Sequence, residues 1–272
     1  MNIEEFKKIH PWPDQSGLSS LFRFMPISAK NTEFVEHLFL KKKLYHSLSS
    51  GFNDPFEGKP HFNMEAKGNK HKAIKQHLIN VARESGMNKK DATTLITNSL
   101  KDPQFIPNSI SEATNKTFNE LRICSFTTDN DNLLFWSHYA NSHKGICIEF
   151  DASIMPIAFA YKVDYSEIYP QITYPIPPDE RAFRPALVKA KVWEYENEYR
   201  TMFIPNFKGL PTDGESLLLD SCTITNVYLG SEIDDEDKNV LLDIILKSDF
   251  NPNIWQASLA KTSFSLQYKQ LN

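Results

Sequence analysis

The chain has 272 residues, of which 40% are hydrophobic and 24% are charged, the composition of an ordinary globular protein. A net charge of -4 at pH 7 argues against a basic face that covers the whole protein and binds nucleic acid, although a local basic groove stays open. No segment approaches the ~20 apolar residues of a membrane span and the first residues contain no apolar signal core, so we expect a cytoplasmic protein of bacterial type without a membrane partner.

The first half of the chain predicts short strands and helices around a dense turn. The pattern predicts an irregular arm (residues 1–20), a strand (21–26), a helix capped by Asn31 (31–39), a strand (44–48) and a turn (49–58). Residues 67–122 then predict a peripheral insertion of three helices, because apolar residues recur there at helical spacing and Ser109 and Glu112 have capping-box spacing. Such an insertion either covers one end of the sheet or offers a surface to a partner.

The second half is organised around residues 123–151, which predict a strand, a short helix and a second strand. The second of these strands shows the period of two that half-buried strands have. The remaining pattern predicts strands at 161–165, 227–230 and 264–268, a strand-like end to 189–204, a proline-rich loop at 170–185 and a helix at 234–247. Because strands and helices mix without strict βαβ alternation, we predict one α+β domain over residues 1–272, with mixed and antiparallel, split-barrel-like sheets and peripheral helices.

Cysteines and histidines do not form a recognisable metal motif. The chain has three cysteines, far apart and odd in number, which is no disulfide framework. His138 and His143 are five residues apart across a turn, which is not a helical zinc pair, and no Cys-x-x-Cys exists. We therefore expect no structural zinc. The chain also lacks Gly-x-Gly-x-x-Gly, a Walker loop and a Gly-x-Ser-x-Gly elbow.

Polar side chains gather on the connections of the central segment. Ser125, Trp136, His138 and Tyr139 lie in or beside the predicted short helix between two strands. Binding groups are often presented in this way, on short connections held by a rigid scaffold. His138, and His46 on the earlier strand, are either packed or exposed imidazoles or ligand contacts.

An acidic and aromatic stretch occupies residues 193–200, with the sequence WEYENEYR. If it were a strand, Glu194, Glu196, Glu198 and Arg200 would share one face, opposite the aromatic residues. Three like charges on one face repel one another unless a cation, a metal or a ligand lies among them. Arg200 can neutralise one carboxylate, and another can stabilise a cationic transition state. The alternative is a solvated edge with the aromatics packed inward.

Two further residues have both a structural and a functional interpretation. Arg23 lies between two Phe on the first predicted strand, either as a surface residue or as a fixed guanidinium suited to a phosphate or carboxylate. Asn53 opens the turn before Pro55, whose short polar side chains either shape the turn or line a cleft.

Three motifs carry a resemblance to a known family. The sequences FNDPFE (52–57), FWSHYANSHKGICIEFD (135–151) and VWEYENEYR (192–200) are similar to the pattern of the uncharacterised domain-of-unknown-function family numbered 2971. Together with LFRFMP early and YLG late, they span nearly the whole chain in order. The family name conveys no activity.

A second resemblance concerns mechanism. The opening strand, helix and strand resemble the opening of ADP-ribosyltransferase folds, which implies NAD as a substrate. The resemblance implies that Arg23 contacts NAD and that Glu198 or Glu196 engages the nicotinamide ribose. These folds also have an aromatic residue or a serine in the middle of the domain, and Ser125 or Tyr139 would correspond to it. Tyr139 or Trp136 would then stack on nicotinamide.

Three functions follow as hypotheses. The first is an ADP-ribosyltransferase-like enzyme that binds a nucleotide-like small molecule, NAD, and modifies an unknown protein or nucleic-acid acceptor. The second is a metal-assisted hydrolase or nuclease, in which a divalent cation is gathered by Glu194, Glu196, Glu198 and Asp54 or Asp151. The third is a non-catalytic ligand-sensing or partner-binding module.

For the first hypothesis, the expected site has ten residues. We expect catalysis by Glu198, Glu196 and Tyr139, no protein-held metal, and ligand contacts from Arg23, His46, Asn53, Ser125, Trp136, His138 and Arg200. Convergence of Arg23, Tyr139 and Glu198 on one cavity would favour this hypothesis over the other two.

Overall fold

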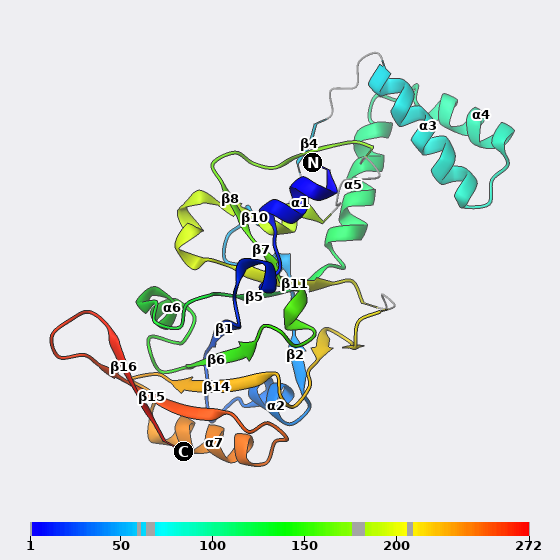
Figure 1. Ribbon diagram of the computed structural model, residues 1–272. Coiled ribbons are helices and arrows are strands. Elements are labelled where there is room, and N and C mark those ends of the chain that lie inside the picture. Colours follow the sequence, from blue (N-terminus) through cyan, green and yellow to red (C-terminus); the bar gives the residue numbers. More distant parts are fainter. Residues whose placement is uncertain (1, 59–60, 64–68, 176–182, 206–208, 272) are drawn as a thin grey trace.

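The structure is a computed structural model that describes residues 2–58, 61–63, 69–175, 183–205 and 209–271. Its α-helices are α1 (Ile3–Ile9), α2 (Glu33–Phe39), α3 (Asn69–Glu84), α4 (Lys89–Ser99), α5 (Phe105–Phe118), α6 (Leu133–His138) and α7 (Asp235–Leu246) (Figure 1). The 3-10 helices are η1 (Asp14–Ser16), η2 (Ser49–Gly51), η3 (Ile157–Phe159), η4 (Arg184–Leu187) and η5 (Lys191–Glu196). None of the helices within these ranges is long and apolar enough to cross a lipid bilayer.

The strands are short. They are β1 (Ser20–Met25), β2 (Lys43–Tyr45), β3 (Ser47–Leu48), β4 (His61–Asn63), β5 (Arg122–Phe126), β6 (Ile146–Asp151), β7 (Tyr161–Lys162), β8 (Asp164–Ser166), β9 (Gln171–Thr173), β10 (Val188–Ala190), β11 (Tyr199–Phe203), β12 (Thr212–Asp213), β13 (Ser216–Leu218), β14 (Ile224–Leu229), β15 (Asn253–Leu259) and β16 (Leu266–Gln270).

These strands pair into sheets of mixed direction. A five-stranded sheet has the order β1-β6-β14-β15-β16 and is antiparallel except between β14 and β15. A four-stranded sheet, β3-β5-β11-β7, and a three-stranded sheet, β12-β13-β2, are antiparallel, and β10-β8 and β4-β9 are parallel pairs. The predicted α+β class is therefore confirmed. Among the described strands no sheet closes into a barrel, and all of the sheets are open.

The five-stranded sheet is covered on both faces. Alternation along β1 and β6 places Leu21 and Ile148 on the face that packs against α2 and α7. Phe24 and Cys147 point to the other face, where the indole of Trp136 on α6 packs. The predicted period of two on β6 is present, and Cys147 is a fully buried free thiol because α6 covers its face.

The five-stranded and four-stranded sheets meet at one isolated bridge. Phe22 on β1 and Thr127, just after β5, exchange both backbone hydrogen bonds at 2.8 Å. Thr127 is buried, and its hydroxyl donates to the backbone oxygen of Glu196 at 2.8 Å. The chain before β11 is thus fixed at the junction of the two sheets.

The motif between α6 and β6 is a tight turn. Asn141, Ser142 and His143 all have positive φ, between 48° and 66°, which residues other than glycine adopt rarely. A Cβ on Gly145 would lie 2.4 Å from the backbone oxygen of Met25. The glycine is therefore needed for close approach to β1, which explains its place in the motif.

Helices α3 and α4 form a lobe beside the sheets. In Figure 1 the lobe projects from the body and is joined to it through α5. It has its own small core, with Ile74, Leu78 and Ile79 of α3 packed on Ala92 and Ile96 of α4. The predicted helical insertion at 67–122 is therefore present in its described part, which begins at residue 69.

Several predicted boundaries were wrong. The segment 1–20, predicted to be irregular because of its prolines, contains α1, since Asn2 and Glu5 form a capping box at its start. The α2 N-cap is Thr32 rather than Asn31, and α5 begins at Phe105 rather than near Ser109. The predicted loop at 170–185 contains β9 and part of η4, and its residues 176–182 lie outside the described part.

Candidate functional site

The acidic stretch 193–200 is a strand only at its end. The 3-10 helix η5 covers its first half, Asn197 follows with a φ of 44°, and β11 begins after that. Asn tolerates this left-handed conformation better than most residues. The turn breaks the predicted alternation: Glu194 is exposed and pairs with Lys191, while Glu196 and Glu198 are both buried.

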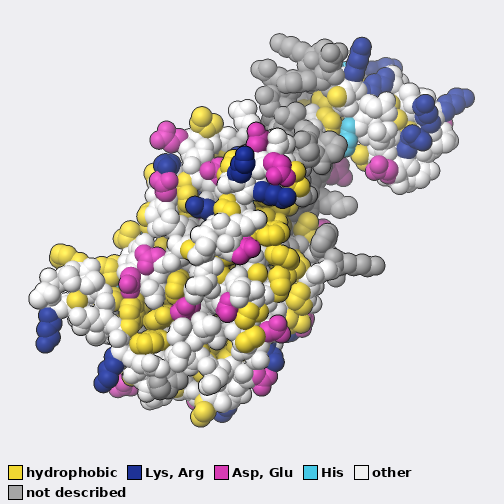
Figure 2. All heavy atoms as spheres, in the orientation of Figure 1, with side chains coloured by type: hydrophobic (Ala, Val, Ile, Leu, Met, Phe, Trp, Pro, Cys, Tyr) yellow, Lys and Arg dark blue, Asp and Glu magenta, His cyan; other side chains and the backbone are white. Residues whose placement is uncertain are grey.

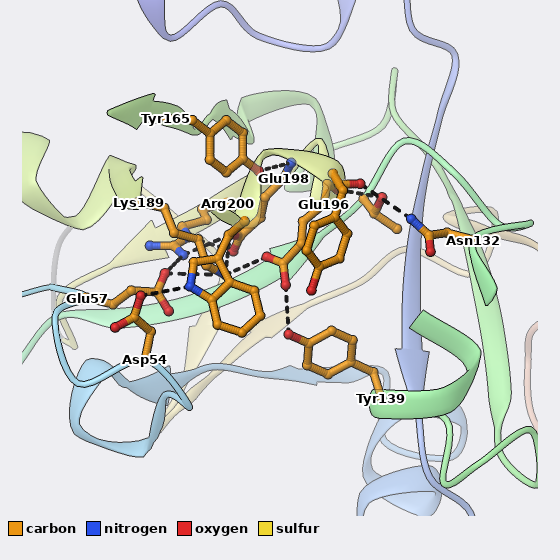
Figure 3. A network of polar contacts seen from close by, with 12 residues as sticks. Asp54, Glu57, Asn132, Tyr139, Tyr165, Lys189, Glu196, Glu198 and Arg200 are labelled. Atoms are coloured by element: carbon orange, nitrogen blue, oxygen red, sulfur yellow. Dashed lines mark hydrogen bonds and ion pairs between the residues drawn. The ribbon is translucent and has the colours of Figure 1, made fainter. Parts of the chain in front are cut away.

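Arg200 on β11 is the central cation of the site and is only 1% exposed. Its guanidinium donates from Nε and one terminal nitrogen to the two oxygens of Glu198, at 2.7 and 2.9 Å (Figure 3). It also donates to the carboxylate of Glu57 and, at 2.6 Å, to the backbone oxygen of Ala186. This bidentate geometry fixes both the guanidinium and the Glu198 carboxylate.

Lys189 on β10 is the second buried cation. Its ammonium nitrogen lies 2.5 Å from Glu196, 3.2 Å from Glu198 and 3.5 Å from Glu57. It also lies over the ring of Trp193, 5.1 Å from the centroid. One lysine therefore joins carboxylates from three places in the sequence, and Figure 3 shows these side chains pointing toward one another.

The protonation states follow from burial and pairing. Burial acts to raise the pKa of Glu198, but Arg200 and Lys189 outweigh it and hold that pKa at about 2. Burial lowers the pKa of Lys189, and the carboxylates around it outweigh that effect, so the net shift is upward. Burial raises the pKa of Glu57 despite the neighbouring Arg200. The cluster therefore contains three carboxylates and two cations.

Glu196 is oriented by groups outside the ion pairs. The phenol of Tyr139 donates to its second oxygen at 2.7 Å, and its backbone oxygen accepts from Thr127. Burial and the bond to Glu196 raise the pKa of Tyr139, so its hydroxyl stays protonated at neutral pH. The backbone N–H of Glu198 donates to the phenol oxygen of Tyr165 at 2.8 Å. Both carboxylates therefore have fixed positions.

This cluster forms one wall of a cavity of about 220 Å³ at the junction of the sheets. The cavity combines aromatic and polar side chains: Phe22, Arg23, Phe24, Ser47, Gly51, Phe52, Asn53, Asp54, Glu57, Ile123, Ser125, Phe126, Thr127, Phe135, Tyr139, Lys189, Trp193, Glu196, Glu198 and Arg200. A second cavity of about 340 Å³ shares Asp54, Glu57 and Lys189 with the first.

Arg23 has a different environment from the other cations of the cavity. Its guanidinium donates to the backbone oxygen of Ser125 at 2.8 Å. No Asp or Glu of the described ranges lies within ion-pair distance of it. Arg23 is therefore the cation of this cavity whose charge is not compensated by a neighbouring carboxylate.

Most of the sequence-predicted residues converge on this cavity. It is lined by Arg23, Asn53, Ser125, Tyr139, Glu196, Glu198 and Arg200. Ser125 also donates to Glu198 and contributes to its low pKa. The convergence of Arg23, Tyr139 and Glu198, on which the nucleotide hypothesis depends, is therefore observed.

Three expected ligand contacts do not reach the cavity. His46 is fully buried, and its ring nitrogens bond the backbone oxygen of Leu44 and the hydroxyl of Thr201, both at 2.8 Å. Since a carbonyl oxygen only accepts, Nδ1 carries the proton and Nε2 accepts from Thr201. Trp136 is buried in the sheet core and donates to the backbone oxygen of Asn130, and His138 is exposed outside the cavity. Their expected roles are corrected to structural or surface ones.

The sequence interpretation missed Glu57 and Lys189. Glu57 lay in a turn that was given either a structural or a cleft-lining role, without a role of its own, and Lys189 lay in an ambiguous segment. The one local signal was the acidic stretch itself, since three nearby carboxylates require cations from elsewhere in the fold. Trp193 was also missed; its indole donates to Asp54 at 3.0 Å and closes one side of the cavity.

The cluster does not offer the predicted divalent-cation site. Within the described ranges no group of three His, Cys, Asp or Glu is placed to hold a metal ion. Lys189 and Arg200 occupy the space between the carboxylates, and neither Glu194 nor Asp151 lines the cavity. The donor set therefore suits an organic ligand better than a cation.

In comparisons with known proteins, no family model matches the chain, and neither a curated protein nor a solved structure matches it. The resemblances drawn from the sequence motifs therefore stay predictions, and the functional argument depends on the geometry of the cavity.

Proposed function

We propose that the chain is an ADP-ribosyltransferase-like enzyme that binds NAD in the cavity at the sheet junction. The observation that carries the proposal is that Arg23, a guanidinium with no carboxylate partner among the described residues, lines the same cavity as the Glu196 and Glu198 carboxylates. A ligand with an anionic part and a hydroxyl-bearing part that becomes cationic matches this distribution of charge. NAD is such a ligand, with its pyrophosphate, ribose and nicotinamide.

The aromatic side chains supply the remaining recognition. Tyr139, Phe52 and Trp193 line the cavity and offer flat surfaces for a heteroaromatic ring. A cavity of about 220 Å³ is smaller than the ~300–1,000 Å³ of typical small-molecule sites, so it suits the nicotinamide and its ribose rather than the whole molecule. The neighbouring cavity, which shares Lys189 and Glu57, provides further room.

The proposed step breaks the bond between the ribose carbon and nicotinamide. The electron pair of that bond goes to the nicotinamide nitrogen, and positive charge develops on the ribose. The Glu198 carboxylate, kept ionised by Arg200 and Lys189, stabilises this charge. The acceptor heteroatom then bonds to the same carbon and releases its proton to water. Tyr139 holds Glu196 in place.

The test is NAD binding by calorimetry together with release of free nicotinamide, using water, protein and nucleic acid as acceptors. We expect Arg23→Gln to weaken binding by about tenfold or more, since a charge-assisted contact is worth roughly 1.5–3 kcal/mol. We expect Glu198→Gln to lower turnover by about 100-fold. Lys144→Gln, an exposed site outside the cavity, is the control and should change neither.

The outcomes separate the competing functions. No NAD binding by the unmodified protein would end the proposal. If NAD binds but no nicotinamide is released with any of the three acceptors, the result would favour a ligand-sensing module instead. Circular dichroism of each variant shows whether it is folded; if Glu198→Gln does not fold, Tyr139→Phe serves in its place.

A further inference from the structure

The lobe formed by α3 and α4 differs in charge from the rest of the chain. Residues 71–101 contain six Lys and Arg and two Asp and Glu, a net charge of +4. Since the whole chain carries -4, the remainder carries -8. Figure 2 shows Lys and Arg side chains gathered on this projecting part, with few acidic ones beside them.

The lobe's cations are also unpaired. None of the six lies within ion-pair distance of an Asp or Glu in the part of the chain that the structure describes. Lys72, Arg83, Lys89, Lys90 and Lys101 are exposed. In the body, by contrast, cations such as Lys43 and Arg122 pair with Asp213 and Glu215 at 2.6 Å. The positive field of the lobe is therefore not compensated locally.

The composition of the lobe limits the class of molecule that it is suited to bind. Residues 71–101 contain no Phe, Tyr or Trp, so they offer no platform on which unpaired bases stack. They do offer exposed amides and a hydroxyl, from Gln76, Asn80 and Thr94, that can bond phosphate oxygens. Cations with hydrogen-bonding groups and no aromatic rings suit the phosphate backbone of a duplex.

The cations are held on a folded surface. Ile74 and Leu78 of α3 and Ile96 of α4 are buried in the lobe's own core, so the helices keep their charges at fixed positions. We propose that this lobe binds double-stranded nucleic acid through its phosphate backbone, without reading base sequence. The proposal is independent of the NAD site, because none of its residues lines that cavity.

Fluorescence anisotropy with a labelled duplex of ~24 base pairs, and with one of its strands alone, tests this on the whole protein. The lobe variant combines Lys72→Gln, Arg83→Gln, Lys89→Gln and Lys90→Gln. The matched control removes the same charge from exposed body sites, with Lys8→Gln, Lys144→Gln, Lys261→Gln and Lys269→Gln.

We expect duplex binding that weakens as salt rises, with a slope near -0.9 in log K against log salt for each phosphate contacted. The lobe variant should bind at least about tenfold more weakly at 50 mM salt and show a shallower slope. The control should bind as the unmodified protein does. DNA and RNA duplexes both count as support.

Three results would overturn the proposal: no duplex binding at low salt, an equal loss in the control, or tighter binding of the single strand. Competition by polyglutamate as strong as by duplex would also overturn it, in favour of an acidic protein partner. Thermal melting of the lobe variant confirms that it is folded. If it is not, the smaller change Lys72→Gln with Arg83→Gln is measured instead, against Lys261→Gln with Lys269→Gln, and an equal loss in both would overturn the proposal.

Discussion

The charge cluster of the cavity and the helical lobe use similar residue types in opposite ways. In the cluster, Glu57, Lys189, Glu196, Glu198 and Arg200 are each no more than 8% exposed, and every one has an opposite charge beside it. On the lobe the cations lie mostly at the surface, without carboxylate partners among the residues that the structure describes. Burial, rather than residue type, decides whether a charge depends on its neighbours for stability or is free to attract a partner.

The largest effect should come from removing the central cation of the cluster. Arg200→Met leaves Glu198 and Glu57 buried without their main partner, and breaking a buried ion pair costs about 3–5 kcal/mol. Urea denaturation measures this loss. The exposed Lys191→Met, which breaks a surface pair with Glu194, is the matched control and should cost less than about 1 kcal/mol. Equal losses in the free energy of unfolding for the two variants would show that the buried ion pairs of Arg200 do not stabilise the fold.

Acid should destabilise the buried region through His46. Burial lowers its pKa from 6.5 to about 3, so the folded protein keeps the ring neutral while the unfolded chain takes up a proton below pH 6.5. Stability is therefore present above pH 6.5 and lost as the pH falls toward 3. Between pH 7 and 5 we expect a loss of about 2 kcal/mol that His46→Gln lacks. Identical pH profiles in urea titrations would contradict this assignment.

Removing one hydroxyl from the cavity should have a smaller effect. Tyr139→Phe loses the bond to Glu196, and a bond to a charged acceptor is worth roughly 1.5–3 kcal/mol, toward the lower end because Tyr139 is only half-buried. Tyr228→Phe, which loses a 2.8 Å bond to Glu149 outside the cavity, is the control. Both should lower the melting temperature, but only Tyr139→Phe should weaken NAD binding.

The smallest effect on stability should come from the lobe. Lys72→Gln with Arg83→Gln removes two exposed cations without carboxylate partners, and such surface changes usually stay within about 0.5 kcal/mol. Unchanged melting together with weaker duplex binding would sharpen the contrast with the cluster. A loss above 1 kcal/mol would mean that these side chains contribute to the lobe's folding.

Local patterns predicted the elements better than the site. The helix at 234–247 and the strand at 146–151 match α7 and β6 closely, since both have strong apolar periodicity. The acidic stretch was misassigned because alternating residues fit a strand, although Asn197 is a residue type that often ends a helix in left-handed conformation.

Tertiary pairing accounts for what the sequence did not predict. Glu57 and Arg200 are 143 residues apart, and no local pattern connects them. The contribution of Lys189 and the exclusion of Trp136 follow from how the sheets and α6 pack. Arg23 and Glu198 were expected to lie near each other from the resemblance to ADP-ribosyltransferase folds, and both line the cavity.

The bridge between Phe22 and Thr127 has a mechanical consequence. Arg23 lies on β1 of the five-stranded sheet, Glu198 lies immediately before β11 of the four-stranded sheet, and this bridge lies at the border between the two sheets. A ligand that contacts both side chains would link the two sheets across their border and oppose their separation. Bound ligand is therefore expected to slow amide hydrogen exchange at Phe22 and Thr127 more than at any position in the lobe.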